Sequence, residues 1–223
     1  HELGHFFGIN HVQLNVTEAN SSTLSDRSVV PTMSPFFTPD TGSHIKTLNK
    51  DDEVAVAFLY PASSFSETKV TVTGTVYDTD GATEFPCAVV IARNTANSRV
   101  DAVSYMTGTV SPAETQDGGF TLYVDAGNTY SIEVVDVESS FSGSSGIIPC
   151  NGSSGNPSAP TFDSATHAST ASGSAGEAVT GMNFTLANTS SNVGDATITD
   201  SDGDGVMNST DNCPNAANAD QAD

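Results

Sequence analysis

Residues 1–11 read HELGHFFGINH and combine three histidines with one glutamate at regular spacing. On a helix, His1 and His5 stand four residues apart, so both imidazoles project from one face and can occupy adjacent corners of a tetrahedral metal site. Gly8 can end this helix in a left-handed conformation and turn the chain back. His11 can then supply a third ligand from outside the helix.

Glu2 is adjacent to the first histidine, where its carboxylate can take a proton from a water instead of binding the metal. The alternative interpretation is an exposed helix that carries ordinary histidines. The complete pattern, HExxHxxGxxH, resembles that of the metzincin metalloproteases. The resemblance implies a zinc-dependent endopeptidase in which His1, His5 and His11 bind Zn²⁺ and Glu2 is the catalytic base.

A methionine between two prolines follows at Met33, flanked by Pro31 and Pro35. In metzincins a methionine on a tight turn lies beneath the zinc-binding imidazoles, and Met33 resembles that residue. Residues 35–37 are then expected to form the wall of a substrate pocket. A methionine beside prolines is otherwise typical of ordinary core packing.

Residues 48–61, LNKDDEVAVAFLYP, predict a short helix that Asn49 caps and Pro61 stops, with acidic residues in its first turn. Its buried face is expected to contain the apolar residues Val54, Ala55, Phe58 and Leu59. The segment is similar to the closing helix of matrixin-type catalytic domains. Residues 1–62 are therefore interpreted as the C-terminal part of an α+β metzincin catalytic domain.

Residues 69–187 carry strand patterns. KVTVTGTVY at 69–77 alternates strictly, with Val70, Val72 and Val76 on one face. Further strands are predicted at 87–93, 102–107, 120–124, 130–137 and 182–187. The prediction is an all-β antiparallel sandwich of about seven strands. Its motif order resembles the carboxypeptidase regulatory-like, transthyretin-like domains, and a fibronectin-like sandwich is the alternative.

The interval 139–180 is rich in Ser, Gly, Ala and Pro and is predicted to be a flexible excursion from the sandwich.

The segment 195–223 contains acidic residues at every second position, followed by Gly205, a pattern that wraps oxygen ligands around one hard cation. The predicted Ca²⁺ ligands are Asp200, Asp202, Asp204, the backbone carbonyl of Val206, and Asp211. The segment resembles a thrombospondin type 3 calcium repeat. A charged, disordered tail is the alternative.

The three cysteines give an odd count. The resemblance to a calcium repeat assigns Cys213 to a bridge with a later repeat, which leaves Cys87 and Cys150 as the expected disulfide. Three unpaired thiols are the alternative.

The charge and composition of the chain restrict the classes of partner that it is expected to bind. The chain has 27 acidic and 6 basic residues among 223, a formal charge of −21, which argues against binding to nucleic acids or anionic membranes. The sequence contains no run of about 20 apolar residues that would form a transmembrane segment. A secreted, extracellular enzyme is expected, with Zn²⁺ and Ca²⁺ as cofactors. Its expected partners are a protein or peptide substrate and extracellular matrix or cell-surface material.

The chain begins inside its own metal-binding motif and is expected to be a fragment of a longer enzyme, inactive by itself. The competing function is that of a calcium-dependent surface or adhesion protein with a vestigial zinc domain.

Overall fold

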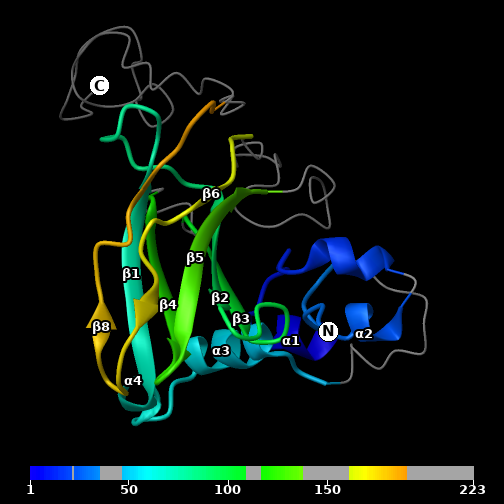
Figure 1. Ribbon diagram of the computed structural model, residues 1–223. Coiled ribbons are helices and arrows are strands. Elements are labelled where there is room, and N and C mark those ends of the chain that lie inside the picture. The colour runs from blue at the N-terminus through cyan, green and yellow to red at the C-terminus, as the bar shows by residue number, and fades with distance from the viewer. Residues whose placement is uncertain (22, 36–46, 109–116, 138–160, 190–223) are drawn as a thin grey trace, which may run out of the picture.

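The computed structural model describes residues 1–21, 23–35, 47–108, 117–137 and 161–189. Two β-sheets contain most of the described residues that are in regular secondary structure, and a few short helices from the N-terminal part of the chain lie to one side of them (Figure 1). Among these residues, no helix has the length and hydropathy needed to cross a membrane.

The first sheet is organised around β1 (Lys69–Tyr77). β1 pairs antiparallel with β4 (Gly119–Asp125) along most of its length. It also pairs in parallel with two short strands, β8 (Ala178–Val179) and β9 (Phe184–Thr185). The prediction of a wholly antiparallel sandwich is therefore wrong for these two strands. The chain crosses from the second sheet to the first between β7 and β8, and a crossover of this kind permits parallel pairing.

The second sheet is organised around β2 (Ala88–Asn94), which lies between β3 (Ala102–Met106) and β5 (Thr129–Asp136) in antiparallel pairing. The short strands β6 (Ala165–Thr166) and β7 (Ala171–Ser172) pair with the far side of β5. The five long strands were all predicted, to within a residue or two.

Alternate residues of the long strands form one core between the two sheets. Val70, Val72 and Val76 are all fully buried, as the alternation predicts. β4 and β5 contribute residues in the same way: Phe120, Leu122, Val124, Tyr130, Ile132 and Val134. Burial of each valine, leucine or isoleucine is worth about 1.5–3 kcal/mol, so this core is the main stabilising feature of the described fold.

The predicted flexible excursion at 139–180 is wrong for its second part. Residues 165–179 contain β6, β7 and β8, and Ala171 is fully buried. Small residues allow this segment to lie close to β5 and β1, although they give no strong strand pattern in the sequence. The first part, 139–160, lies outside the described residues.

β2 is buried on both faces because the N-terminal part of the chain covers the outer face of the second sheet. Val90 points into the main core, whereas Val89 and Ile91 join a smaller cluster with Leu14. Leu14 follows the HELGHFFGINH motif closely in the sequence. The motif is thereby attached directly to the sandwich.

The helices are α1 (Glu2–Phe6), the 3₁₀ helix η1 (Val16–Asn20), α2 (Leu24–Arg27), α3 (Lys50–Leu59) and α4 (Phe65–Thr68). α3 packs against β3, with α1 beyond its end (Figure 1). Its N-cap residue is Asn49, as predicted, in a reciprocal capping box with Asp52.

The predicted buried face of α3 is correct only in part: Val54 is half-buried and packs against the main core, but the two larger residues are not buried. Phe58 and Leu59 are 47% and 45% exposed, whereas Asp51 and Asp52 are buried. Two buried carboxylates are tolerated here because backbone N–H groups donate hydrogen bonds to both.

Candidate metal centre

α1 positions two of the three histidines. His1 is its N-cap residue and His5 lies in its last turn. The N–H groups of Gly8 and Ile9 donate to the carbonyls of His5 and Gly4, both at 3.0 Å, which is the Schellman arrangement that ends a helix. This ending requires a positive φ, and Gly8 has φ +86°. The chain then reverses and brings His11 back to α1.

The Nε2 atoms of the three imidazoles converge. Nε2 of His11 lies 3.2 Å from Nε2 of His1 and 3.1 Å from Nε2 of His5. One ligand atom from each of the three residues lies within 4.8 Å of the other two. Within the described parts of the chain, no other three His, Cys, Asp or Glu side chains bring their ligand atoms together in this way.

The other ring nitrogen of each helical histidine faces a backbone carbonyl. Nδ1 of His1 lies 2.7 Å from the oxygen of Thr32, and Nδ1 of His5 lies 2.9 Å from the oxygen of Ile9. A carbonyl only accepts, so each Nδ1 carries the proton and each Nε2 presents a lone pair. Nε2 of His11 can donate to at most one of these two lone pairs. A cation at their meeting point would satisfy both.

Zinc fits this geometry. Tetrahedral zinc binds imidazole nitrogens at about 2.0–2.1 Å, which places two such nitrogens about 3.3–3.4 Å apart. The observed separations of 3.2 and 3.1 Å are close to that value. Carbonyl groups that fix the tautomer of a ligand histidine are also typical of zinc sites. Three ligands would leave a fourth position open for a reactant.

Met33 lies under α1, and its side chain is 2% exposed. A Cβ atom built on Gly4 would lie 2.2 Å from the Sδ atom of Met33. Only a residue without a side chain therefore permits the observed contact between α1 and this methionine. Met33 is packed against the helix that carries two of the imidazoles. Its role as the methionine of a metzincin turn stays a prediction.

Asp52 holds the turn around Met33. Its carboxylate accepts hydrogen bonds from the N–H of Thr32 at 2.8 Å and from the N–H of Met33 at 3.0 Å. The Nδ2 of Asn49 donates to the carbonyl of Val30 at 2.5 Å. Since the carbonyl of Thr32 accepts from His1, the start of α3 fixes the peptide that orients a candidate ligand.

The two residues before Asp52 connect α3 to the sandwich. Asp51 accepts hydrogen bonds from the N–H of Ser104 at 2.6 Å and from its hydroxyl at 2.9 Å. Lys50 forms an ion pair with Asp125. Removal from water raises the pKa of Asp51 to about 7, although the Ser104 hydrogen bonds act in the opposite direction.

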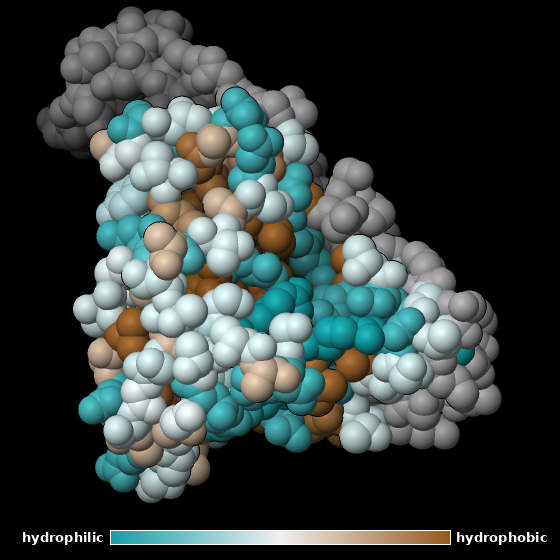
Figure 2. Space-filling view, in the orientation of Figure 1, coloured by the Kyte–Doolittle hydropathy of each residue, from teal (hydrophilic) through white to brown (hydrophobic). Residues whose placement is uncertain are grey.

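Glu2 lies in the first turn of α1 and its side chain is exposed. It is not among the residues whose ligand atoms converge. α1 has no buried residue, and Leu3 and Phe6 are 65% and 82% exposed. Figure 2 shows hydrophobic residues at the surface of this face, including the region where α1 and α3 lie.

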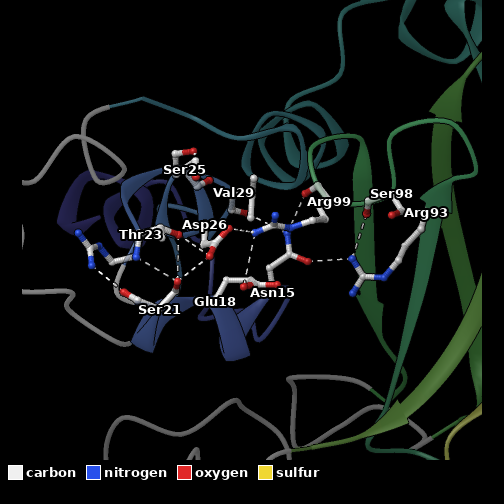
Figure 3. A network of polar contacts seen from close by, with 12 residues as sticks. Asn15, Glu18, Ser21, Thr23, Ser25, Asp26, Val29, Arg93, Ser98 and Arg99 are labelled. Carbon is white, nitrogen blue, oxygen red and sulfur yellow. Dashed lines mark hydrogen bonds and ion pairs between the residues drawn. The ribbon is translucent and has the colours of Figure 1, made fainter.

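A polar network joins the segment after His11 to the sandwich (Figure 3). Nδ2 of Asn15 donates to the carbonyls of Val29 and Arg99, and its Oδ1 accepts from Nη1 of Arg93 at 2.8 Å. Arg99 also forms an ion pair with Asp26 at 2.7 Å. Hydrogen bonds from Ser21 and Thr23, and then the one from Arg99, hold the pKa of Asp26 below its usual range. The candidate metal centre and the sandwich are thus held together by specific polar contacts.

Cys87 is disulfide-bonded and almost fully buried. Cys150 and Cys213 lie outside the described residues, so the expected pairing of Cys87 with Cys150 stays a prediction. The same holds for the predicted calcium ligands Asp200, Asp202, Asp204, Val206 and Asp211, and for Phe36 and Phe37 of the expected pocket wall.

Several residues of the centre were not predicted. Gly4 was not singled out because its role depends on the approach of Met33, which no local pattern shows. Asp52 was predicted only as a charge in the first turn of a helix, whereas it binds two peptides from a different segment. The D-D pair at 51–52 is a usable signal, since two adjacent acids on a helix that packs into a protein need donors from elsewhere.

Comparison with known proteins finds one family. Residues 188–221 match the model of the thrombospondin type 3 repeat. No curated protein and no solved structure matches the chain significantly. Thrombospondin type 3 repeats bind calcium and are typical of extracellular proteins, so the match supports Ca²⁺ as a ligand of this chain and an extracellular setting for it.

Proposed function

We propose that this chain carries the metal centre of a secreted, metzincin-like zinc endopeptidase. One observation carries the proposal: the Nε2 atoms of His1, His5 and His11 converge, while backbone carbonyls hold the Nδ1 protons of two of them. Met33 beneath the helix and the Schellman turn at Gly8 are further support, because each is a feature that the sequence motif predicts.

The three imidazoles would hold the ion and leave its fourth position free for the reactants. Bound zinc supplies a Lewis acid there, next to the scissile carbonyl. Glu2 takes a proton from the attacking water, whose hydroxyl adds to the acyl carbon. The C–N bond then breaks, and Glu2 passes the proton to the leaving amine. The reaction consumes one water molecule and releases a carboxylic acid and an amine.

Zinc binding is the first test. We expect one Zn²⁺ per chain by calorimetry, and a Co²⁺ form whose visible absorption is that of a tetrahedral site. His5→Ala should abolish both signals. His167→Ala removes a half-buried histidine of the sandwich that is not part of the converging group, and it should change neither. Stoichiometric zinc binding that survives His5→Ala would refute the centre.

Turnover is the second test and belongs to the full-length protein that contains this chain. We expect it to hydrolyse an unstructured protein with zinc, and to lose that activity with a zinc chelator. By itself the 223-residue chain is expected to bind zinc without turnover, because a peptidase also needs a groove that aligns an extended substrate.

The thrombospondin type 3 match favours a second candidate, a calcium-dependent surface or adhesion protein in which the zinc centre is vestigial. The same assay separates the two. Calcium-dependent adhesion by a protein that binds no zinc and cleaves no peptide would favour this candidate.

A further inference from the structure

The helix that carries two of the candidate ligands has no apolar anchor of its own. α1 has five residues, and none of them is buried. A helix this short is unstable in isolation, because its nucleation costs more than one turn of hydrogen bonds returns. Contacts with other parts of the chain must therefore set the position of α1, and with it the distances from His1 and His5 to His11.

The turn around Met33 provides several of these contacts. The carbonyl of Thr32 accepts the Nδ1 proton of His1, and α1 lies against the side chain of Met33. The carbonyl of Met33 also accepts a hydrogen bond from the N–H of Val12, the residue after His11, at 3.1 Å. Since this one turn contacts the segments of both histidines, a displacement of the turn would change the distances among the Nε2 atoms.

The first tether from this turn to the sandwich runs through the start of α3. Asp52 accepts hydrogen bonds from the N–H groups of Thr32 and Met33. The preceding residue, Asp51, accepts hydrogen bonds from the N–H of Ser104 at 2.6 Å and from its hydroxyl at 2.9 Å. Ser104 lies on β3, an edge strand of the second sheet, so its N–H is available to α3. A buried carboxylate without donors is costly, and these bonds therefore fix the start of α3 on β3.

The second tether runs through the segment after His11. Gln13 is buried, and its Nε2 donates a hydrogen bond to the carbonyl of Asp136 at the end of β5, at 2.7 Å. Leu14 is buried as well and packs against residues of β2 in the smaller cluster. Because Gln13 is two residues from His11, the backbone of the third ligand leaves directly from a segment that is fixed to the sheet.

Both tethers end on the second sheet, one on β3 and the other on β5, with β2 between them. We propose that the β-sandwich is a positioning element of the metal centre, and that Ser104 and Gln13 are positioning residues. Ser104 fixes His1 through α3 and the turn around Met33, and Gln13 fixes His11. The proposal rests on the metal centre of the proposed function and gives the sandwich a role in it. Residues 1–62 then depend on the sandwich for the geometry of their ligands.

Zinc affinity tests the proposal on the 223-residue chain, by competition with a chromophoric chelator. Gln13→Met keeps the approximate size of the side chain and removes the donor to Asp136, whereas Ser104→Ala removes the hydroxyl that Asp51 accepts. We expect each variant to bind zinc about 2- to 30-fold more weakly, the range that substitutions within a coupled network produce. Ser104→Thr restores a hydroxyl and should bind zinc as the unsubstituted chain does.

Val72→Ala is the matched control, because it destabilises the main core without touching either tether. Urea unfolding of the metal-free proteins verifies that each variant folds and compares their stabilities. Val72→Ala should bind zinc normally even where its stability is the lowest of the set. A fall in zinc affinity in Val72→Ala equal to that in the tether variants would assign the effect to global stability and overturn the positioning roles.

The imidazole ¹⁵N signals of the metal-free protein show where each tether acts. Ser104→Ala is expected to change the ring signals of His1 more than those of His11, toward a mixture of tautomers, and Gln13→Met should do the reverse. Unchanged ring signals and zinc affinities in both variants overturn the positioning roles and leave the metal centre intact. Failure of the unsubstituted chain to bind zinc overturns the metal centre and this inference together.

Discussion

Backbone oxygen atoms, not side chains, orient two of the three candidate zinc ligands. The carbonyls of Thr32 and Ile9 each accept the Nδ1 proton of one histidine. This fixes both imidazoles with their lone pairs inward before any metal arrives, and a preformed site loses less freedom on binding. The proposed catalytic carboxylate is different, since Glu2 is exposed and outside the converging group.

The first prediction concerns Glu2. Because Glu2 is proposed to move the proton without binding the metal, Glu2→Gln in the full-length protein should keep zinc and lose about 10²-fold in kcat. Zinc stoichiometry and steady-state hydrolysis measure the two effects separately. Unchanged turnover in this variant removes Glu2 from the mechanism, and loss of zinc would make it a ligand.

A second prediction concerns the contact between Gly4 and Met33. Gly4→Ala places a methyl group 2.2 Å from the Sδ atom of Met33, so the helix or the methionine must move. Overpacking of this kind costs about 1–3 kcal/mol, and zinc affinity should fall with it. The double variant Gly4→Ala with Met33→Ala makes room again. Its zinc affinity should exceed that of Gly4→Ala alone, and equal affinities would show that the contact is not the cause.

At this scale the sequence identifies the three histidines that converge, whose role as zinc ligands stays a prediction, but it does not identify the residues that support them. His1, His5, His11, Gly8 and Met33 could be identified because the spacing of a local motif constrains them. Gly4 and the buried carboxylates act through contacts with segments about 20 to 50 residues away, which a local pattern does not contain.

At the scale of elements, the described helix α3 forms polar contacts with three different parts of the chain. Three consecutive residues in its first turn point in different directions, since each residue of a helix is rotated by about 100° from the last. Lys50 reaches Asp125, Asp51 reaches Ser104, and Asp52 reaches the turn at Met33. One helical turn thereby links the sandwich to the floor of the candidate centre.

The third prediction follows from the buried carboxyl group of Asp51. Its pKa in the folded protein is about 7, above the ordinary 3.8, so between these values the folded protein binds more protons than the unfolded chain. Stability contributed by this group is therefore present at low pH and lost as the pH rises toward 7. The full shift corresponds to roughly 4 kcal/mol.

Asp51→Asn removes this titration and keeps an acceptor for Ser104. The difference in unfolding free energy between Asp51→Asn and the unsubstituted protein should grow in favour of the variant from about pH 4 to about pH 8, measured by urea unfolding. Both proteins share all other titrating groups, so the pH dependence of this difference in unfolding free energy reports on residue 51 alone. A difference that stays constant across this range would contradict the assignment.

The strands that the sequence predicted correctly are those with a clear hydrophobic pattern. The alternation in β1 and the apolar run of β2 correspond to residues buried on one face and on two faces, respectively. β6, β7 and β8 have two residues each and are built from Ala, Ser, Thr and Val in a segment rich in small residues. Their pairing depends on the position of β5 and β1, so it could not be read from the segment itself.

For the whole molecule, the N-terminal part and the sandwich are joined by Asn15, which contacts Val29, Arg99 and Arg93 at once (Figure 3). The fourth prediction is that Asn15→Gly, which tolerates the positive φ of this position, lowers stability by about 1–3 kcal/mol through loss of these hydrogen bonds. Thr17→Ala is the control: it also removes the Asn-x-Thr glycosylation motif but leaves the contacts. Equal melting temperatures for both variants would refute a role for Asn15.

The fifth prediction concerns the thrombospondin type 3 segment, residues 188–221. Its predicted ligands repel one another without a cation, so amide exchange across residues 200–213 should slow in calcium and accelerate in chelator. Exchange at β1 and β5 serves as the internal reference. Amide exchange rates in this segment that are the same in calcium and in chelator would argue against a calcium site.

The use of main-chain oxygens has a consequence for how this centre can change by mutation. Substitution at positions 9 or 32 replaces a side chain but cannot delete the carbonyl that orients a histidine. Substitutions at these two positions should therefore be tolerated as long as the backbone conformation is preserved. This backbone conformation depends on Gly8 and Asp52, neither of which would bind the metal. When homologues lose the metal centre, we therefore expect the first substitutions to occur at residues such as Gly8 and Asp52 as often as at the histidines.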